Sequence, residues 1–149
     1  MLKFFTILFL SLFLAACTNT NIPLDKGLTA RMDAPNASLD QQKALSIINH
    51  LRITKNSPAL ISDIDLIKQA NILAQKYATN GITPKKPKTA DAIQISAGYA
   101  NFANTFSGWR SNNTSLNTLT NPNFSRAGIG VAYSQNSTNG VYWVLLLSK

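Results

Sequence analysis

The chain has 149 residues, with 14 lysines and arginines against 6 acidic residues, and a formal net charge of +8. This length fits one domain plus processing segments, and it can bury a core without help from disulfides or metal ions. The chain contains one cysteine, one histidine and no glutamate. A single cysteine excludes an intramolecular disulfide and a metal site built from several thiolates.

The N-terminal stretch 1–16 has the pattern of a secretory signal peptide. Lys3 precedes an apolar run over residues 4–14, and small residues precede Cys17. The run is shorter than the about 20 apolar residues of a membrane-spanning helix. Residues 14–17, Leu-Ala-Ala-Cys, also resemble the bacterial lipobox, in which the cysteine becomes the lipidated N-terminus. We therefore predict lipidation at Cys17, with a soluble secreted protein as the alternative. In a Gram-negative cell, Thr18 would direct the lipoprotein to the outer membrane.

Residues 17–37 contain two prolines and one glycine without sustained hydrophobic periodicity, so we predict a flexible tether there. The domain is then expected over 38–149. Ser38 and Gln41 have the spacing of a capping box, which predicts the start of the first helix. Its apolar face, at helical spacing, consists of Ala44, Leu45, Ile47, Ile48 and Leu51.

A second, long helix is expected from Ser62, which with Asp65 offers an N-cap, to Gly81, which suits a left-handed stop. The polar loop 82–92 follows. Its lysines allow two interpretations, a solvated loop kept soluble by charge or a contact with an acidic polymer or lipid headgroups. These lysines are Lys85, Lys86 and Lys88.

The C-terminal part predicts a helix over 101–109, with Asn101 as its cap, followed by a polar turn and a β-hairpin. Phe102, Phe106 and Trp109 recur at helical spacing, which is typical of a core-facing stripe. The hairpin strands are expected at 127–133 and 141–147. Asn139-Gly140 lies between them and supplies the positive-φ residues that tight hairpins need.

The order of these features resembles the CAP superfamily of cysteine-rich secretory, antigen 5 and pathogenesis-related proteins, in its short bacterial form. Asn49 and Arg52 resemble the Asn-x-x-Arg that closes the first helix of that family. The resemblance implies an α+β fold, an α/β/α layered sandwich with a small antiparallel sheet. The matching frame in the C-terminal part is Trp109, Asn112, Leu119, Asn121-Pro122, Gly128-Ile129-Gly130 and Tyr142-Trp143.

Many members of that family hold a divalent metal with two His and two Glu in a cleft. The resemblance places the first His near Thr83 or Pro84, the Glu near Ile93 and the second His on Ser115. Since the chain has no glutamate and one histidine, it lacks this tetrad. We therefore expect no metal, no cofactor and no catalytic residue in the cleft. The candidate cleft-lining residues are Thr83, Gln94, Asn112 and Ser115.

The other residues that could act in catalysis or metal binding have simpler interpretations. His50 has no acid at i±3 or i±4, which favours an ordinary helix-surface residue over a general base. Asp63 and Asp65 are two positions apart and point to different faces of a helix. Asp91 is the only acid expected near the cleft, and one carboxylate makes a poor metal site. Several asparagines follow position 111; they suit either hydrogen bonding to sugars or peptides, or turns.

We expect a membrane-anchored, non-catalytic binding or envelope-interaction module. Its expected partners are the membrane, through the lipid, and a cell-wall polymer, anionic lipid or envelope protein, whereas nucleic acid is not expected in the envelope. A lipid-binding module and a hydrolase with an unrecognised site are the alternatives. A lipid carrier should have an apolar gap between helices, and a polymer binder should have an open polar groove.

Overall fold

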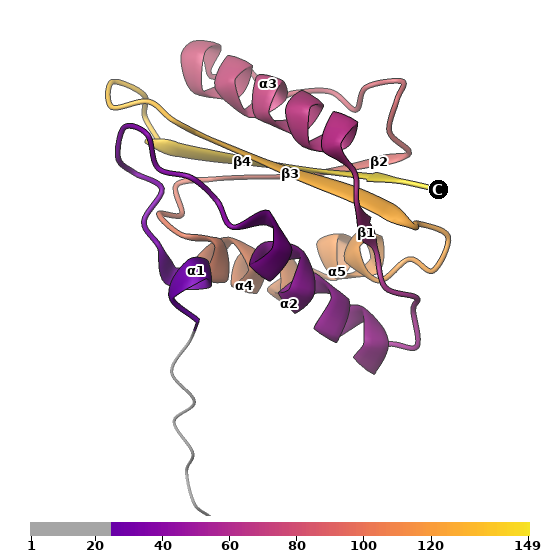
Figure 1. Cartoon of the computed structure of the whole chain (residues 1–149). Coiled ribbons are helices and arrows are strands. Elements are labelled where there is room, and N and C mark those ends of the chain that lie inside the picture. Colours follow the sequence, from indigo (N-terminus) through magenta and orange to yellow (C-terminus); the bar gives the residue numbers. More distant parts are fainter. Residues whose placement is uncertain (1–24) are drawn as a thin grey trace, which may run out of the picture.

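The computed structural model describes residues 25–149, so the predicted signal peptide and Cys17 lie outside the described residues. Within that range no helix combines the length and the hydrophobicity that crossing a membrane requires. The elements, shown in Figure 1, are α1 (Lys26–Thr29), α2 (Gln41–Thr54), β1 (Ile61–Ser62), α3 (Ile64–Asn80), β2 (Ala92–Ala97), α4 (Phe102–Ser111), α5 (Asn113–Leu119), β3 (Arg126–Tyr133) and β4 (Val141–Ser148).

The four strands form one sheet in the order β1-β3-β4-β2. The hairpin β3–β4 is antiparallel, and β2 pairs antiparallel with the other side of β4. The short β1 runs parallel to β3. The sequence predicts the two hairpin strands to within one residue at each end, but not β1 or β2. The connection from β3 to β4 spans residues 134–140, and only Gly140 of the expected pair has a positive φ, 70°. The connection is therefore longer than the expected tight turn.

The sheet lies between two helical layers, so the predicted α/β/α sandwich is confirmed. Helix α3 covers one face, and α1, α2, α4 and α5 cover the other (Figure 1). Side chains of β4 alternate between the two layers, as the pleat of a strand requires. Trp143, Leu145 and Leu147 belong to the larger core on the side of α2 and α4, whereas Val144 and Leu146 pack in the core under α3.

Helix α3 approaches the sheet so closely that two strand positions have no room for a side chain. A Cβ atom at Gly128 would overlap the backbone of Leu66 and Ile67, and one at Gly130 would overlap the backbone of Ala70. The buried residues of α3 are correspondingly small along this contact, with Ala70 and Ala74 both fully buried. The Gly-Ile-Gly segment thus sets the distance between helix and sheet.

The helix ends partly differ from the predictions, because aspartates compete with the expected serine caps. Asp40, not Ser38, caps α2, and its carboxylate accepts a hydrogen bond from the Lys43 amide at 3.1 Å. Asp63, not Ser62, caps α3. The predicted left-handed stop at Gly81, with φ 70°, is confirmed. Asn101 caps α4 as predicted.

Residues 25–37 do not form the flexible tether that the sequence predicts. Leu28 and Met32 are buried in the larger core, and the Met32 amide donates to the carbonyl of Ala100 at 2.7 Å. Lys43 forms an ion pair with Asp25 at 2.8 Å, which fastens α1 to α2. The segment is therefore held in place by two buried apolar side chains and a backbone hydrogen bond, although its sequence has little hydrophobic periodicity.

Arg52 joins α2 to the segment that follows α5. Its side chain is fully buried and donates to the carbonyls of Pro58 at 2.7 Å, Leu119 at 2.6 Å, Asn121 at 3.1 Å and Phe124 at 2.9 Å. Burial lowers the pKa of this guanidinium from its usual value. Since the four acceptors are neutral, the hydrogen bonds and not an ion pair hold the charge in place.

Candidate functional site

Three of the four predicted cleft residues lie together, and the fourth does not. The amide of Gln94 on β2 donates to the hydroxyl of Ser115 on α5. Asn112 accepts a hydrogen bond from the Ser115 amide at 3.0 Å and caps α5. The expected polar turn at this point is therefore a helix. Thr83 is exposed in the loop after α3 and has no hydrogen bond to this group.

The positions that correspond to the family's metal ligands carry no charge here. Gln94 and Ser115 satisfy each other, and Ser115 is buried. Ile93 packs on the opposite side of the sheet, in the core under α3. Within residues 25–149, no group of three or more His, Cys, Asp or Glu side chains is arranged to hold a metal ion. The residues present at this position do not fit the family's metal.

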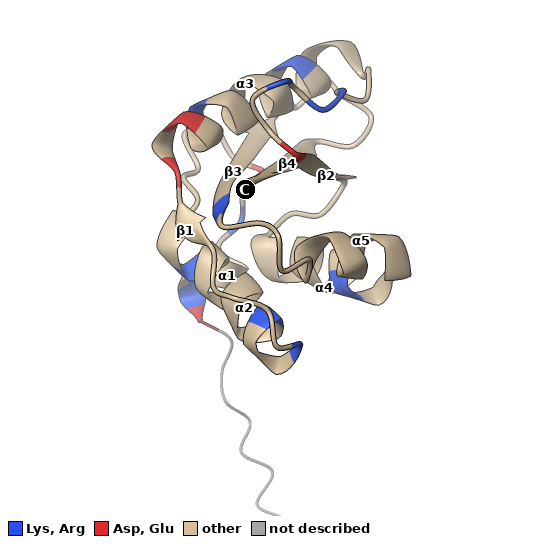
Figure 2. Cartoon of the chain, turned by 90° about the vertical axis from the view of Figure 1, so that its right-hand side faces the viewer, with Lys and Arg blue, Asp and Glu red and all other residues tan. Residues whose placement is uncertain are grey.

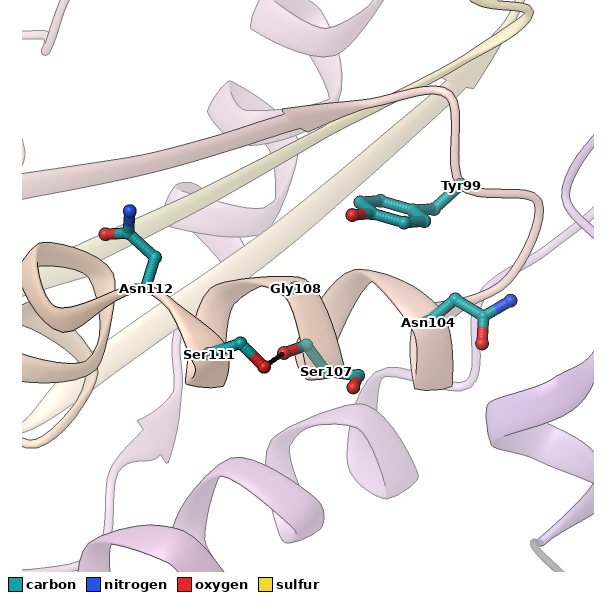
Figure 3. Close-up of a pocket in the computed structure, with 6 residues that line it drawn as sticks. All are labelled: Tyr99, Asn104, Ser107, Gly108, Ser111 and Asn112. Carbon is teal, nitrogen blue, oxygen red and sulfur yellow. Dashed lines mark hydrogen bonds between the residues drawn. The ribbon is translucent and has the colours of Figure 1, made fainter.

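A groove of about 490 Å³ opens beside this group, along α4. Figure 3 shows the ring of Tyr99 above Gly108, with Asn104 and Asn112 toward the two ends of α4. The complete lining is Tyr99, Asn104, Ser107, Gly108, Ser111 and Asn112. Asn112 belongs to both features, whereas Thr83, Gln94 and Ser115 do not line the groove.

The sequence of α4 produces this groove through its two faces. Asn104, Ser107, Gly108 and Ser111 recur at the i, i+3, i+4, i+7 spacing of one helical stripe. The opposite stripe, Phe102, Phe106 and Trp109, is buried, and the Phe102 ring lies 5.7 Å from that of Trp143. The apolar face anchors α4 in the core, and the polar face is left to line the groove.

The loop that carries Tyr99 is fixed from several sides. Trp143 donates from Nε1 to the carbonyl of Tyr99 at 2.8 Å, and Gly98 donates to Val141 at 2.9 Å. The neighbouring Ala100 carbonyl accepts the hydrogen bond from Met32 described above. Tyr99 itself remains 40% exposed. The core thus holds an aromatic ring at the surface, where its phenol end touches Gly108.

Gly108 leaves the space that the phenol end of Tyr99 occupies. A Cβ atom at this position would stand 3.0 Å from the Tyr99 hydroxyl oxygen and 3.2 Å from two ring carbons. Such contacts are tight, and the half-exposed tyrosine would have to move to relieve them. The pairing of a glycine on α4 with a tyrosine on the preceding loop therefore determines where the ring lies.

None of the six groove residues is an acid, a base of the Lys or Arg type, or a histidine. The lysine-rich loop lies beside α3, on the other side of the sheet from α4 and α5 (Figure 2). The nearby Arg110 guanidinium packs 5.9 Å from the centre of the Phe106 ring. The groove thus combines hydroxyl and amide groups with the apolar surface of the Tyr99 ring, and it carries no charged side chain.

The acids and the histidine singled out from the sequence have structural partners elsewhere. Asp91 accepts hydrogen bonds from the Lys149 amide at 2.8 Å and the Ser148 hydroxyl at 3.1 Å, and the first of these lowers its pKa most. Asp63 pairs with Arg126 at 2.8 Å. His50 is exposed on α2, and its Nδ1 lies 3.1 Å from the Ser46 carbonyl. No described aspartate or histidine lines the groove.

Sequence reasoning missed Tyr99 and Gly108, since it considered only the buried stripe of α4. The signal was present as the complementary stripe of small and polar residues at helical spacing. The sequence does not indicate that Tyr99 lies over that stripe. The position of Tyr99 depends on the hydrogen bond from Trp143, which is 44 positions away along the chain.

The sequence pattern of the family described as CAP, the cysteine-rich secretory protein family, matches residues 45–147, which is more than half of the chain. The protein therefore belongs to the CAP family. No curated protein matches the sequence at a significant level.

Solved structures agree on the fold. An outer surface protein of Borrelia burgdorferi is 18% identical, with a TM-score of 0.62 over 72% of this chain and 90% of that one. An extracellular protein with an SCP domain from Bacillus anthracis is 17% identical, with a TM-score of 0.59 over 73% of this chain. This chain spans only 40% of that protein. The hookworm platelet inhibitor is 13% identical, with a TM-score of 0.53, over 78% of this chain and 74% of that one.

Proposed function

We propose that the protein is an exported, membrane-anchored CAP-domain lipoprotein whose domain binds a component of the cell envelope without catalysing a reaction. The observation that carries this proposal is the open groove on α4, which is lined by amides, hydroxyls and one aromatic ring and has no charged side chain. An open polar groove is what a polymer binder requires, whereas a lipid carrier requires an apolar gap.

The absence of a positioned base in the groove argues for binding and against hydrolysis. A serine nucleophile needs an adjacent base, and a metal-bound water needs several fixed ligands. Neither Ser107 nor Ser111 has an adjacent base or a set of metal ligands. The Ser111 hydroxyl donates at 2.8 Å to the Ser107 carbonyl, which is not a base. Gln94 and Ser115 are neutral oxygen and nitrogen groups that bind transition metals weakly.

Titration calorimetry with zinc on the purified full-length protein tests the non-catalytic role. We expect no tight stoichiometric binding, and hydrolysis of casein or peptidoglycan at background with or without a chelator. His50→Ala is the control, because His50 is the only imidazole in the chain. Micromolar or tighter zinc affinity that survives His50→Ala would contradict the proposal. The zinc ligands would then have to be groups such as Gln94 and Ser115, which bind transition metals weakly.

Export and anchoring rest on the signal-peptide pattern and the cysteine at position 17. Two of the structural neighbours are described as an outer surface protein and an extracellular protein, which supports export. Cys17→Ser should release the protein from the membrane fraction as an unlipidated precursor. A variant that fractionates with membranes like the wild type, at unchanged mass, would show that the anchor is not at Cys17.

A further inference from the structure

We propose that the groove between Tyr99 and α4 is a binding site for a neutral saccharide chain, with the Tyr99 ring as the stacking surface. This inference rests on the proposed function and names the ligand class of the same site. The groove of about 490 Å³ falls within the range of about 300–1,000 Å³ that small-ligand sites take. It can accept a short oligosaccharide.

The aromatic ring supplies the first half of saccharide recognition. One face of a pyranose ring presents C–H groups, which pack against the electron-rich face of an aromatic ring. Tyr99 is one of the six large hydrophobic residues in the described chain that are exposed, and the other five are isoleucines. Its loop is held by Trp143 and Met32, so stacking on the ring requires little ordering of the protein.

Amides and hydroxyls supply the second half. The Asn104 side chain, the Asn112 Nδ2 atom and the hydroxyls of Ser107 and Tyr99 make no hydrogen bond within the described residues. An asparagine amide both donates and accepts, as sugar hydroxyls and acetamido groups do. The two asparagines lie on either side of the ring (Figure 3), where they can fix the orientation of a stacked sugar.

Other ligand classes fit the groove less well. A charged ligand would find no opposite charge among the lining residues. An apolar ligand would cover amides and hydroxyls and leave them without partners, which is unfavourable. An extended peptide would normally add to a free strand edge. Here the carbonyl of Ile95, on the edge strand β2 beside α4, already accepts the Trp109 Nε1 hydrogen at 3.1 Å.

The test is titration calorimetry on the full-length protein, in a detergent without a sugar headgroup. The probes are chitotetraose, which carries acetamido groups, and cellotetraose, which does not. We expect binding of at least one of them at millimolar concentration or below. A preference for chitotetraose would assign the asparagine amides to the acetamido group, and equal binding would assign recognition to the ring and the hydroxyls. Either result supports the site.

Variants locate the binding. Tyr99→Ala should weaken it at least about tenfold, and Tyr99→Phe should retain most of it because the stacking surface remains. Gly108→Ala should also weaken it, since the added methyl group displaces the tyrosine. Asn104→Ala should weaken it as well, because it removes an amide from the groove. Asn117→Ala is its matched control, because Asn117 is exposed on α5 outside the groove. Melting temperatures measured in parallel keep loss of binding separate from loss of folding.

Two outcomes overturn the inference. One is that neither saccharide gives any heat of binding at millimolar concentration, whether or not a neutral peptide binds. The other is saccharide binding that is unchanged in both Tyr99→Ala and Gly108→Ala. Product analysis after the titration separates this inference from the proposed function. Cleaved chitotetraose would contradict the non-catalytic role and leave the site intact, whereas absent binding with background hydrolysis would remove only the saccharide site.

Discussion

The two faces of the sheet are covered by helices in opposite ways. On the α3 face, glycines meet alanines and the helix backbone rests on the strands at Gly128 and Gly130. On the α4 face, large aromatic rings fill the larger core, and a glycine in the helix makes room for the Tyr99 ring at the surface. The first arrangement leaves no room for a side chain between helix and strands at these two positions, whereas the second leaves the groove beside Tyr99. We therefore expect the saccharide to bind on the α4 face.

The larger core can be tested first, by removing its central aromatic residue. Trp143 is fully buried and holds the carbonyl of Tyr99. Trp143→Ala should lower the free energy of unfolding by about 3–5 kcal/mol, through lost burial and the cavity that remains. Urea unfolding measures this, with Ile72→Ala, which is 51% exposed, as the control. An unchanged midpoint would show that the aromatic core does not carry the stability of this face.

The α3 face is tested by adding a single methyl group. Gly130→Ala places a Cβ atom against the backbone of Ala70, which cannot rotate away as a side chain can. The helix must shift from the sheet, so we expect a loss of about 3 kcal/mol. The measurement is again the urea midpoint. A variant as stable as the wild type would mean that α3 can move outward freely, and that the close contact is not required.

The edge of the α3 face should also respond to pH. The amides of Leu66 and Asp65 lower the pKa of Asp63 below its usual 3.8, and Arg126 contributes further. The stabilisation from a lowered carboxylate pKa is complete above pH 3.8 and disappears as the pH falls through the folded-state value. Asp63→Ala, which removes the helix cap, should cost about 1 kcal/mol at pH 7.

A second variant separates the charge of Asp63 from its cap. Asp63→Asn keeps a capping side chain but cannot titrate, so its melting temperature should fall less than that of the wild type between pH 5 and about pH 3. Asp65→Asn is the control, because the Asp65 carboxylate is exposed and its one ion-pair partner among the described residues, Lys68, lies 3.9 Å away. Identical acid profiles for wild type and Asp63→Asn would contradict the assigned role.

The same contrast explains what could be predicted from the sequence. Periodicity identified α2, α3, α4 and the hairpin strands, because burial on one face leaves a local pattern, but it identified neither α1 nor α5. Arg52 was recognised only through a resemblance, since its acceptors Leu119 and Phe124 lie about 70 positions away. Residues 25–37 were misjudged for a similar reason. Their order depends on Met32 meeting Ala100 and not on their own pattern.

The candidate site was predictable in part. Gln94, Asn112 and Ser115 do lie together, and the resemblance supplied their positions. Thr83 does not join them; it is exposed in the loop after α3 and makes no hydrogen bond to this group. The groove itself escaped prediction, since it requires a loop residue to fold back over the polar stripe of α4.

The smallest expected effect on stability comes from Gly108→Ala, and its sign sharpens the contrast between the faces. Alanine is favoured over glycine in a helix by about 1 kcal/mol. The new methyl group would stand 3.0 Å from the Tyr99 hydroxyl, but this neighbour is a half-exposed side chain that can move by a few tenths of an ångström. We therefore expect unfolding free energy to rise by less than about 1 kcal/mol, opposite in sign to Gly130→Ala. Equal losses in the two variants would show that Tyr99 is held as rigidly as the backbone of α3, so that the groove belongs to the packed core and not to a surface open to ligands.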